Sequence, residues 1–520
     1  MLPRPLPAAL LGLLALSAAP SAARLPAIVD TAIQQITTAE LHKHVEMLAS
    51  DEMSGRGVGH AGNRQAEKYI AGALHDAHVP PAAPDYLQRV EVYEPRLGMN
   101  ASLTVTAGDA SLTDARVGAD FYPLPESGDR PVDARLVFAG HGLTAPDARV
   151  DDYAVVDARG AIVLVLEDVP DAVKRLASLS SDERAAMGSV ERKSADARAH
   201  GAAGLIIVRT YMGDPRALWP ESSSVRSASY RLLGAMRASP MPVAAMSEHA
   251  AAAVRQALDA HKIVHANLVP DVIATPVVMN NVLGIIEGRQ PSADTVVVGA
   301  HLDHDGIDEA GRIYNGADDN ASGTAAVLAI AAAFARAAAQ GQRPSRAVVF
   351  ALWNGEEKGS LGAEYYAAAP LPARHVAANL NLDMIGREEE IPDPSDPRYQ
   401  GFARTAASQN TNVVHLLGYT YSPDLAAIVE GANDTIRLTI KEDYDRDSQG
   451  LLHRSDNWPF LEHGIPAVFL TTGLHPDYHT PDDDTARIDF AKLERITQLA
   501  CRAAWMAADG EAPRLKLPAK

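Results

Sequence analysis

Apolar and polar positions alternate with two periods in the C-terminal half of the chain. Short apolar runs rich in β-branched residues predict buried strands, and longer runs rich in alanine and leucine predict helices. The predicted strands are residues 281–286, 295–300, 346–353, 375–384 and 465–470, and the predicted helices are 324–339, 359–368 and 490–507. Strands that alternate with helices indicate an α/β fold with a mostly parallel sheet and helices on both faces.

The middle of the chain has a different pattern. Short apolar strands at 135–139, 161–166, 204–208 and 242–246 are separated by turn residues and by two helical stretches. A chain of 520 residues is also too long for one simple core. We therefore predict four parts: a leader at 1–23, an N-terminal part of the main domain at 24–133, an inserted β-rich module at 134–262, and the catalytic domain at 263–520.

The first 23 residues resemble a secretory signal peptide. They carry one basic residue, Arg4, an apolar run at 8–19 and a small residue, Ala23, at the expected cleavage position. The run is shorter than the roughly 20 residues that a membrane-spanning helix needs. We expect a periplasmic or secreted protein with no membrane insertion after cleavage, while the oligomeric state stays unknown.

Charge and cysteine content narrow the function classes. The formal net charge of −19 disfavours nucleic acid as a partner. Cys501 is the single cysteine, so the chain can form neither an internal disulfide nor a cysteine-based zinc site.

Polar side chains follow four of the predicted strands at the point where each strand ends. In open α/β sheets, sites lie beyond the carboxyl ends of the strands. Two histidines and three carboxylates suit two divalent cations, above all zinc, that share one bridging carboxylate. Of two adjacent glutamates, one can bind metal while the other takes a proton from water. These candidates are His301, Asp318, Glu356, Glu357, Asp383 and His479.

Several motifs together resemble the M28 family of zinc aminopeptidases. They are HLDH at 301–304, GADDNASG at 316–323, NGEEKGSLGAEYY at 354–366, NLDMIGR at 381–387, and RSDNWPF, GIPAVFL and YHT within 454–480. SDEMSGRGVGHAGN at 50–63 resembles the N-terminal part of that family. In the middle of the chain, VFAGHGLTAP, DDYAVVDARGAIVLV and AHGAAGLIIV resemble a protease-associated (PA) domain. The resemblance implies a zinc-exopeptidase (phosphorylase/hydrolase-like) fold with an inserted PA domain.

The resemblance also implies a role for each site residue. Asp318 would bridge two Zn²⁺ ions per chain, with a cis peptide bond between Asp318 and Asp319. His304 and His475 match no ligand position, and we expect them near the ions without binding them. His301 and Asp383 would bind one ion, and Glu357 and His479 would bind the second. Glu356 would be the general base that acts on a metal-bridging water. Asp303 would orient His301, and Tyr478 would bind the oxyanion.

The implied function is an exported di-zinc metalloexopeptidase that removes N-terminal residues from peptides with a free N-terminus. Two relatives of the same fold remain as alternatives. A glutaminyl cyclase uses a single zinc and would not need all five ligand positions. A metallocarboxypeptidase would need basic side chains for the substrate's C-terminal carboxylate, and the candidates for these are Arg387, Arg437, Lys441, Arg446 and Arg454.

Overall fold

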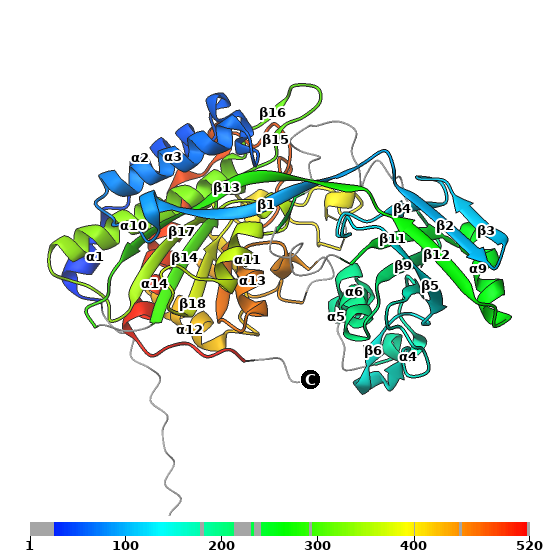
Figure 1. The fold of residues 1–520 in the computed structure, drawn as a ribbon. Helices are drawn as coiled ribbons and strands as arrows, with labels where there is room; N and C mark the ends of the chain where they lie inside the picture. The colour runs from blue at the N-terminus through cyan, green and yellow to red at the C-terminus, as the bar shows by residue number, and fades with distance from the viewer. Residues whose placement is uncertain are drawn as a thin grey trace, which may run out of the picture.

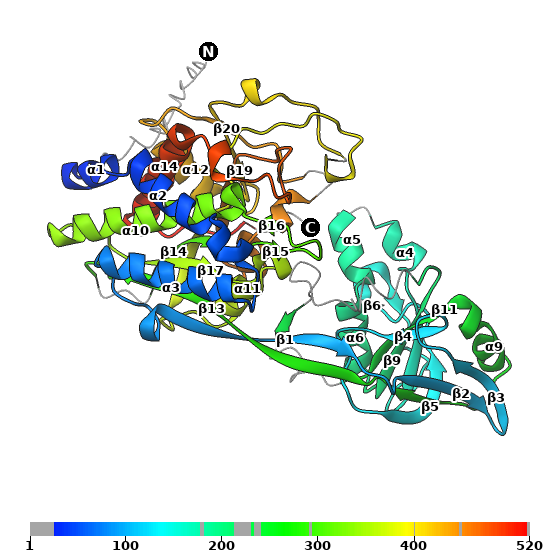
Figure 2. The same cartoon turned by 90° about the horizontal axis from the view of Figure 1, so that it is seen from above.

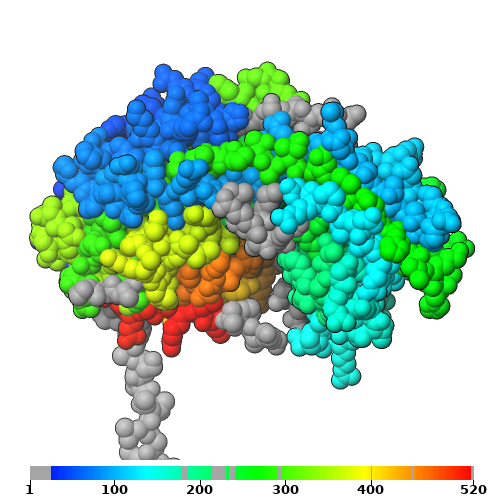
Figure 3. Space-filling view, in the orientation of Figure 1, coloured from blue at the N-terminus to red at the C-terminus, as the bar shows by residue number. Residues whose placement is uncertain are grey.

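The chain folds around two large sheets, which form two lobes side by side (Figures 1 and 3). The computed structural model describes residues 25–176, 181–212, 230–232, 241–290, 294–399, 401–446 and 450–516. The predicted signal peptide at 1–23 lies outside these residues. Two long strands, β1 (Leu87–Leu97) and β13 (Val272–Ile286), pair antiparallel over their length and connect the lobes.

The first sheet has nine strands in the order β10-β1-β13-β17-β14-β18-β21-β19-β20, with β10 (Arg231–Leu232) and β20 (Thr439–Lys441) at its edges. Its centre is parallel, as predicted, whereas β13 and β19 (Val413–Leu417) run antiparallel to their inner neighbours. The sheet is therefore mixed rather than mostly parallel. The reason is that β13 enters from the second lobe and not through a helical crossover, which parallel neighbours require. The four parallel strands are β17 (Ala347–Trp353), β14 (Asp294–His301), β18 (His375–Leu382) and β21 (Ala467–Thr471).

Helices cover both faces of this sheet, as the sequence pattern predicts (Figure 2). Along β14, Val296 and Val298 pack against one helical layer and Val297 against the other. The first layer contains α1 (Ala27–Gln34), α2 (Thr38–Leu48), α3 (Ala61–Asp76), α10 (Gly323–Ala339), α12 (Pro423–Ala432) and α14 (Phe490–Asp509), and the second contains α11 (Leu361–Ala368) and α13 (Asn457–Glu462).

Helix α10 is the central helix of the first layer. Together with the turn before it, α10 forms the helix Ala317–Ala339, the one helix of the described residues that is long and apolar enough to cross a membrane. The most apolar stretch of this helix is 89% buried, because the helix packs against the sheet and against α1 and α14. A helix that is apolar on all sides is typical of the core of a large domain.

The second sheet has eight strands in the order β3-β2-β12-β5-β8-β9-β11-β4, and along the chain it extends from β2 (Ser102–Ala107) to β12 (Val264–Val269). Its central strands are β5 (Val132–Phe138), β8 (Ile162–Leu166), β9 (Gly204–Arg209) and β11 (Val243–Ser247). The predicted insert at 134–262 is therefore too short, because β2, β3 (Ala110–Ala115), β4 (Phe121–Pro123) and β12 also belong to this sheet. These strands find their partners far along the chain, and local pattern cannot show that. The resemblance of this lobe to a PA domain stays a prediction.

Candidate metal centre

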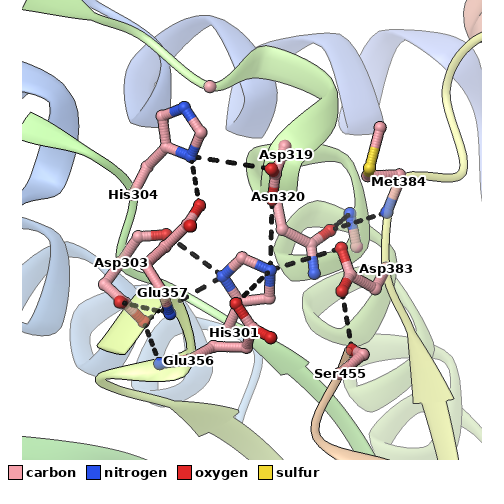
Figure 4. Close-up of polar contacts among 12 residues, drawn as sticks. His301, Asp303, His304, Asp319, Asn320, Glu356, Glu357, Asp383, Met384 and Ser455 are labelled. Carbon is pink, nitrogen blue, oxygen red and sulfur yellow. Dashed lines mark hydrogen bonds and ion pairs between the residues drawn. The ribbon is translucent and has the colours of Figure 1, made fainter. Parts of the chain in front are cut away.

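The candidate residues meet at the carboxyl ends of the four parallel strands, as predicted. His301 is the last residue of β14, and Asp383 directly follows β18. Glu356 and Glu357 form the turn η6 (Glu356–Lys358) after β17, and His479 lies in the loop after β21. Because these strands are neighbours, segments far apart in sequence contribute to one buried site (Figure 4).

Asp319 is the residue that joins two groups of metal-ligand type. Its Oδ1 lies 3.2 Å from Nε2 of His301, which is also 3.2 Å from Oδ1 of Asp383. Its Oδ2 lies 3.0 Å from Nε2 of His479, which is 3.3 Å from Oε2 of Glu357. One carboxylate thus faces two histidines, and each histidine has a second carboxylate of its own.

The prediction that Asp318 bridges the two ions is wrong in this structure, because Asp319 occupies that position. Asp318 is fully buried, but its Oδ1 accepts a 2.6 Å hydrogen bond from the backbone N–H of Gly386. Its Oδ2 faces Nε2 of His475 at 3.3 Å. The cis peptide bond is likewise Asp319–Asn320 and not Asp318–Asp319. Two adjacent aspartates in an irregular loop point in different directions, and the sequence alone does not distinguish them.

Asp303 holds the site together in a different way from the one predicted. Its carboxylate accepts hydrogen bonds from the backbone N–H groups of Gly355 (2.8 Å), Glu356 (3.1 Å) and Glu357 (3.3 Å). It is the backbone carbonyl of Asp303, 3.2 Å from Nδ1 of His301, that orients the imidazole, while the nearest carboxylate oxygen is 4.0 Å away. Asp303 therefore positions the two-glutamate turn and His301 together.

Burial and like charges set the protonation of the site. Burial raises the pKa of the Glu356 carboxyl well above its usual value, and the carboxylates of Glu357, Asp456 and Asp383 raise it further, against the lowering effect of His301. Burial lowers the pKa of His301, but Asp383, Glu356 and Asp319 outweigh it and raise that pKa well above the usual value. This excess of negative charge is suited to cations.

A cavity of about 250 Å³ opens beside these carboxylates. Tyr478 lines it, and burial raises the pKa of this phenol well above its usual value, so the hydroxyl stays protonated. Apolar and polar side chains complete the wall, among them Met384, Leu451, Phe469, Leu474, Thr471, His453 and Arg454.

Sequence reasoning missed several residues that hold the ligands in place. Ser455 donates a 2.6 Å hydrogen bond to Oδ2 of Asp383 and accepts one from Asn381 at 2.7 Å. Asp483 accepts hydrogen bonds from the backbone N–H groups of Asp318 and Asp319 at 3.0 Å each. The run of aspartates at 482–484 is a weak signal for Asp483, whereas Ser455 lies within the RSDNWPF motif, which by itself assigns it no partner.

These features define the class: an α/β protein whose sheet carries a candidate two-metal centre of the kind used in metal-dependent hydrolysis. Residues 281–504 match the model of Peptidase family M28. This match confirms the predicted family resemblance for the C-terminal part of the chain, which contains all the candidate ligands.

Curated relatives agree over parts of their length. A probable zinc metalloprotease of Pyrenophora tritici-repentis is 32% identical over 212 residues, which are 38% of this chain and 46% of that protein. An aminopeptidase of Pseudomonas aeruginosa is 36% identical over 124 residues, covering 23% and 20%. A probable glutamate carboxypeptidase of Zea mays is 28% identical over 215 residues, covering 39% and 26%. The chain spans less than half the length of each of these relatives.

Among solved structures, an aminopeptidase from Aneurinibacillus sp. strain AM-1 aligns with 94% of this chain and 97% of its own. The sequence identity is 17% and the TM-score is 0.48.

Proposed function

We propose that this protein is an exported aminopeptidase that uses two zinc ions. The observation that carries the proposal is the bridging position of Asp319 between His301 and His479, with the half-buried Glu356 beside them, its Oε2 3.9 Å from Nε2 of His301. Export is supported by the signal-like sequence at 1–23, and mature protein beginning at position 24 would agree with it.

The donor set fits zinc. One ion would be held by His301, Asp319 and Asp383, and the other by Asp319, Glu357 and His479, so each has three protein donors as catalytic zinc sites usually do. In the first group, the donor atoms of His301, Asp319 and Asp383 lie within 4.8 Å of one another. In the second group, Nε2 of His479 lies 3.0 Å from Asp319 and 3.3 Å from Glu357. When bound, the ions supply Lewis acidity that polarises the scissile carbonyl and makes water more acidic.

The chain's own residues perform the proton transfers. Glu356 accepts a proton from the attacking water while the water oxygen bonds to the carbonyl carbon. Glu356 then delivers this proton to the leaving amine as the C–N bond breaks. Its carboxyl lines the cavity, with Oε2 3.9 Å from Nε2 of His301. The phenol of Tyr478 donates a hydrogen bond to the oxyanion of the tetrahedral intermediate.

The substrate we propose is a peptide with a free N-terminus. The surplus of carboxylates beside the cavity favours a cationic α-amine, and the apolar wall formed by Met384, Phe469 and Leu474 favours an apolar first side chain. The aminopeptidase relative supports this choice.

A carboxypeptidase is the second candidate, because Arg454 lines the same cavity and a relative carries that name. Of the other basic candidates, Arg387 is ion-paired with Asp477 at 2.8 Å, and Lys441 donates to Asn410 at 3.1 Å. A single-zinc glutaminyl cyclase fits less well, since both donor groups are complete.

The test combines metal analysis with hydrolysis of N-terminally free and N-blocked peptides by the wild type and Glu356→Gln. We expect two zinc ions per chain and cleavage only of peptides with a free N-terminus. For Glu356→Gln we expect kcat to fall about 10²–10⁴-fold while zinc is retained. Glu364→Gln is the matched control, because Glu364 in α11 pairs with His463 at 3.0 Å and does not line the cavity. Cleavage of blocked peptides with a free carboxylate would favour the carboxypeptidase, and one zinc with cyclisation of N-terminal glutamine would favour the cyclase.

A further inference from the structure

The segment that directly follows His301, the last residue of β14, contacts candidate ligands of both donor groups. Asp303 holds the turn of Glu356 and Glu357 through backbone N–H groups. The next residue, His304, faces the side chain of Glu357 (Figure 4). Asp305 follows, with Oδ2 3.8 Å from Nδ1 of His479. Residues 304 and 305 therefore face the second donor group.

His304 is fixed by its surroundings. It is fully buried, and its Nδ1 lies 2.7 Å from Oε1 of Glu357. Its ring packs edge-on against His479, with centroids 5.7 Å apart and an interplanar angle of 82°. On another side it touches Gly316, where an added Cβ would be 2.4 Å from Cδ2 of the ring. The imidazole is therefore packed on two sides, with its Nδ1 toward Glu357.

The two oxygens of Glu357 have separate partners. Oε1 faces His304, while Oε2 faces Nε2 of His479 at 3.3 Å. Nδ1 of His304 is 3.9 Å from Oδ2 of Asp319, too far for a hydrogen bond. Nε2 of His304 has no hydrogen-bond partner among the described residues. Among the described residues, the His304 ring therefore makes one contact of hydrogen-bond length, from Nδ1 to Oε1 of Glu357, the oxygen that does not face His479.

We propose that His304 is a positioning residue for the second zinc ion: its Nδ1–H holds Oε1 of Glu357, so that Oε2 is presented to the ion shared with His479 and Asp319. This inference rests on the proposed two-zinc function. Contacts around a metal ligand typically change metal affinity by about 10–100-fold when they are lost. The first ion's own ligands have other supports, since His301 is held by Asp303 and Asp383 by Ser455.

The test is Zn²⁺ titration of the chelator-stripped full chain, in competition with a chromophoric chelator, for the wild type and three variants. We expect His304→Ala to weaken the second binding step about 10–100-fold and to leave the first step unchanged. His304→Asn should retain most of the affinity, because its amide N–H can take the place of Nδ1–H, while asparagine is a poor zinc ligand. His304→Gln should behave like alanine, because its amide reaches the Nε2 position instead.

A control and the contrary outcomes complete the design. His415 is also fully buried and faces a glutamate, Glu389, at 3.4 Å, and His415→Asn should leave both steps unchanged. The inference is overturned if His304→Ala binds the second ion as tightly as the wild type, or if Asn loses as much as Ala. An unchanged first step shows that a variant is folded. A wild type with a single binding step would overturn the two-zinc proposal as well.

Discussion

Asp318 and Asp319 are adjacent and buried, yet their carboxylates have different partners. Asp319 faces two histidines, whereas Asp318 accepts from Gly386 and faces His475. Under the proposed two-zinc mechanism, Asp319→Asn removes the carboxylate shared by the two ions. The zinc content should then fall from two ions to at most one, and kcat should fall by a factor of at least about 10². Metal analysis after dialysis and steady-state kinetics measure both effects.

Asp318→Asn is the matched control for that prediction. The amide oxygen can still accept from Gly386, so we expect zinc to be retained and the free energy of unfolding to fall by about 1–2 kcal/mol. Loss of zinc in Asp318→Asn with retention in Asp319→Asn would restore the sequence-based assignment.

At the residue scale, the sequence predicted His301, Glu357, Asp383 and His479 in one place because each follows a recognisable buried strand. The bridge was assigned one residue too early, because 317–322 has no periodic pattern that fixes where a side chain points. The role of His304 was equally hidden, since its contact with Glu357 joins the ends of two different strands.

Arg56 shows how one short element supports the metal loop. It lies in η1 (Asp51–Arg56), is 1% exposed, and donates hydrogen bonds to four backbone carbonyls. Burial lowers its pKa to about 10, which still leaves it cationic at neutral pH. The acceptors are the carbonyls of Leu48 and Asn315 at 2.6 Å and of Leu302 and Gly316 at 2.8 Å.

Arg56→Met should therefore be strongly destabilising, because four buried carbonyls lose their donor. We expect the free energy of unfolding to fall by about 3 kcal/mol or more, as each unsatisfied group costs about 1–3 kcal/mol. Zinc affinity should fall as well, because Gly316 begins the loop that carries Asp319. Arg64→Met is the comparison, since Arg64 makes an exposed bond to Gly59 and should change stability by less than about 0.5 kcal/mol. Equal urea midpoints for the two variants would refute this role.

At the scale of elements, the pattern predicted the buried central strands well and the flanking ones poorly. A strand such as β14 is marked by a continuous β-branched run, because both of its faces are covered. By contrast, β20 (Thr439–Lys441) has three residues and β4 has three, which is too short for any period to show. The contacts of Arg56 are equally hidden from local pattern, since its four acceptors come from segments that meet only in the folded chain.

At the scale of the molecule, the chain passes between the two lobes through a stem formed by β1 and β13. Leu97 of β1 pairs with Val272 of β13, and the backbone N–H of Gly98 donates to the carbonyl of Asp271 at 2.7 Å. The lobe has hydrophobic clusters of its own, separate from those of the first sheet. The stem is thus an antiparallel hairpin whose connection happens to be a whole sheet.

Because the stem closes on itself, residues 99–270 should be replaceable by an Asn-Gly turn, which joins antiparallel strands with matching twist. The shortened chain loses β10 (Arg231–Leu232), so β1 becomes an edge strand and some stability is lost. We nevertheless expect a folded protein, because each candidate ligand lies outside the removed segment. Its zinc affinity should stay within about threefold of the wild type, a difference in binding free energy of less than about 1 kcal/mol. Circular dichroism and zinc titration test this.

The comparison is deletion of 134–262, the boundaries that the sequence suggested. That cut removes β5 (Val132–Phe138) except its first two residues, along with β8, β9 and β11, but leaves β2 and β12. Leu103 of β2 and Leu268 of β12 are buried in the second lobe and would then be exposed on the strands that remain. Exposed apolar strands promote aggregation. We expect this variant to be insoluble while the 99–270 replacement is soluble. The opposite result would mean that the first lobe depends on the second for folding, and that the stem does not separate two units.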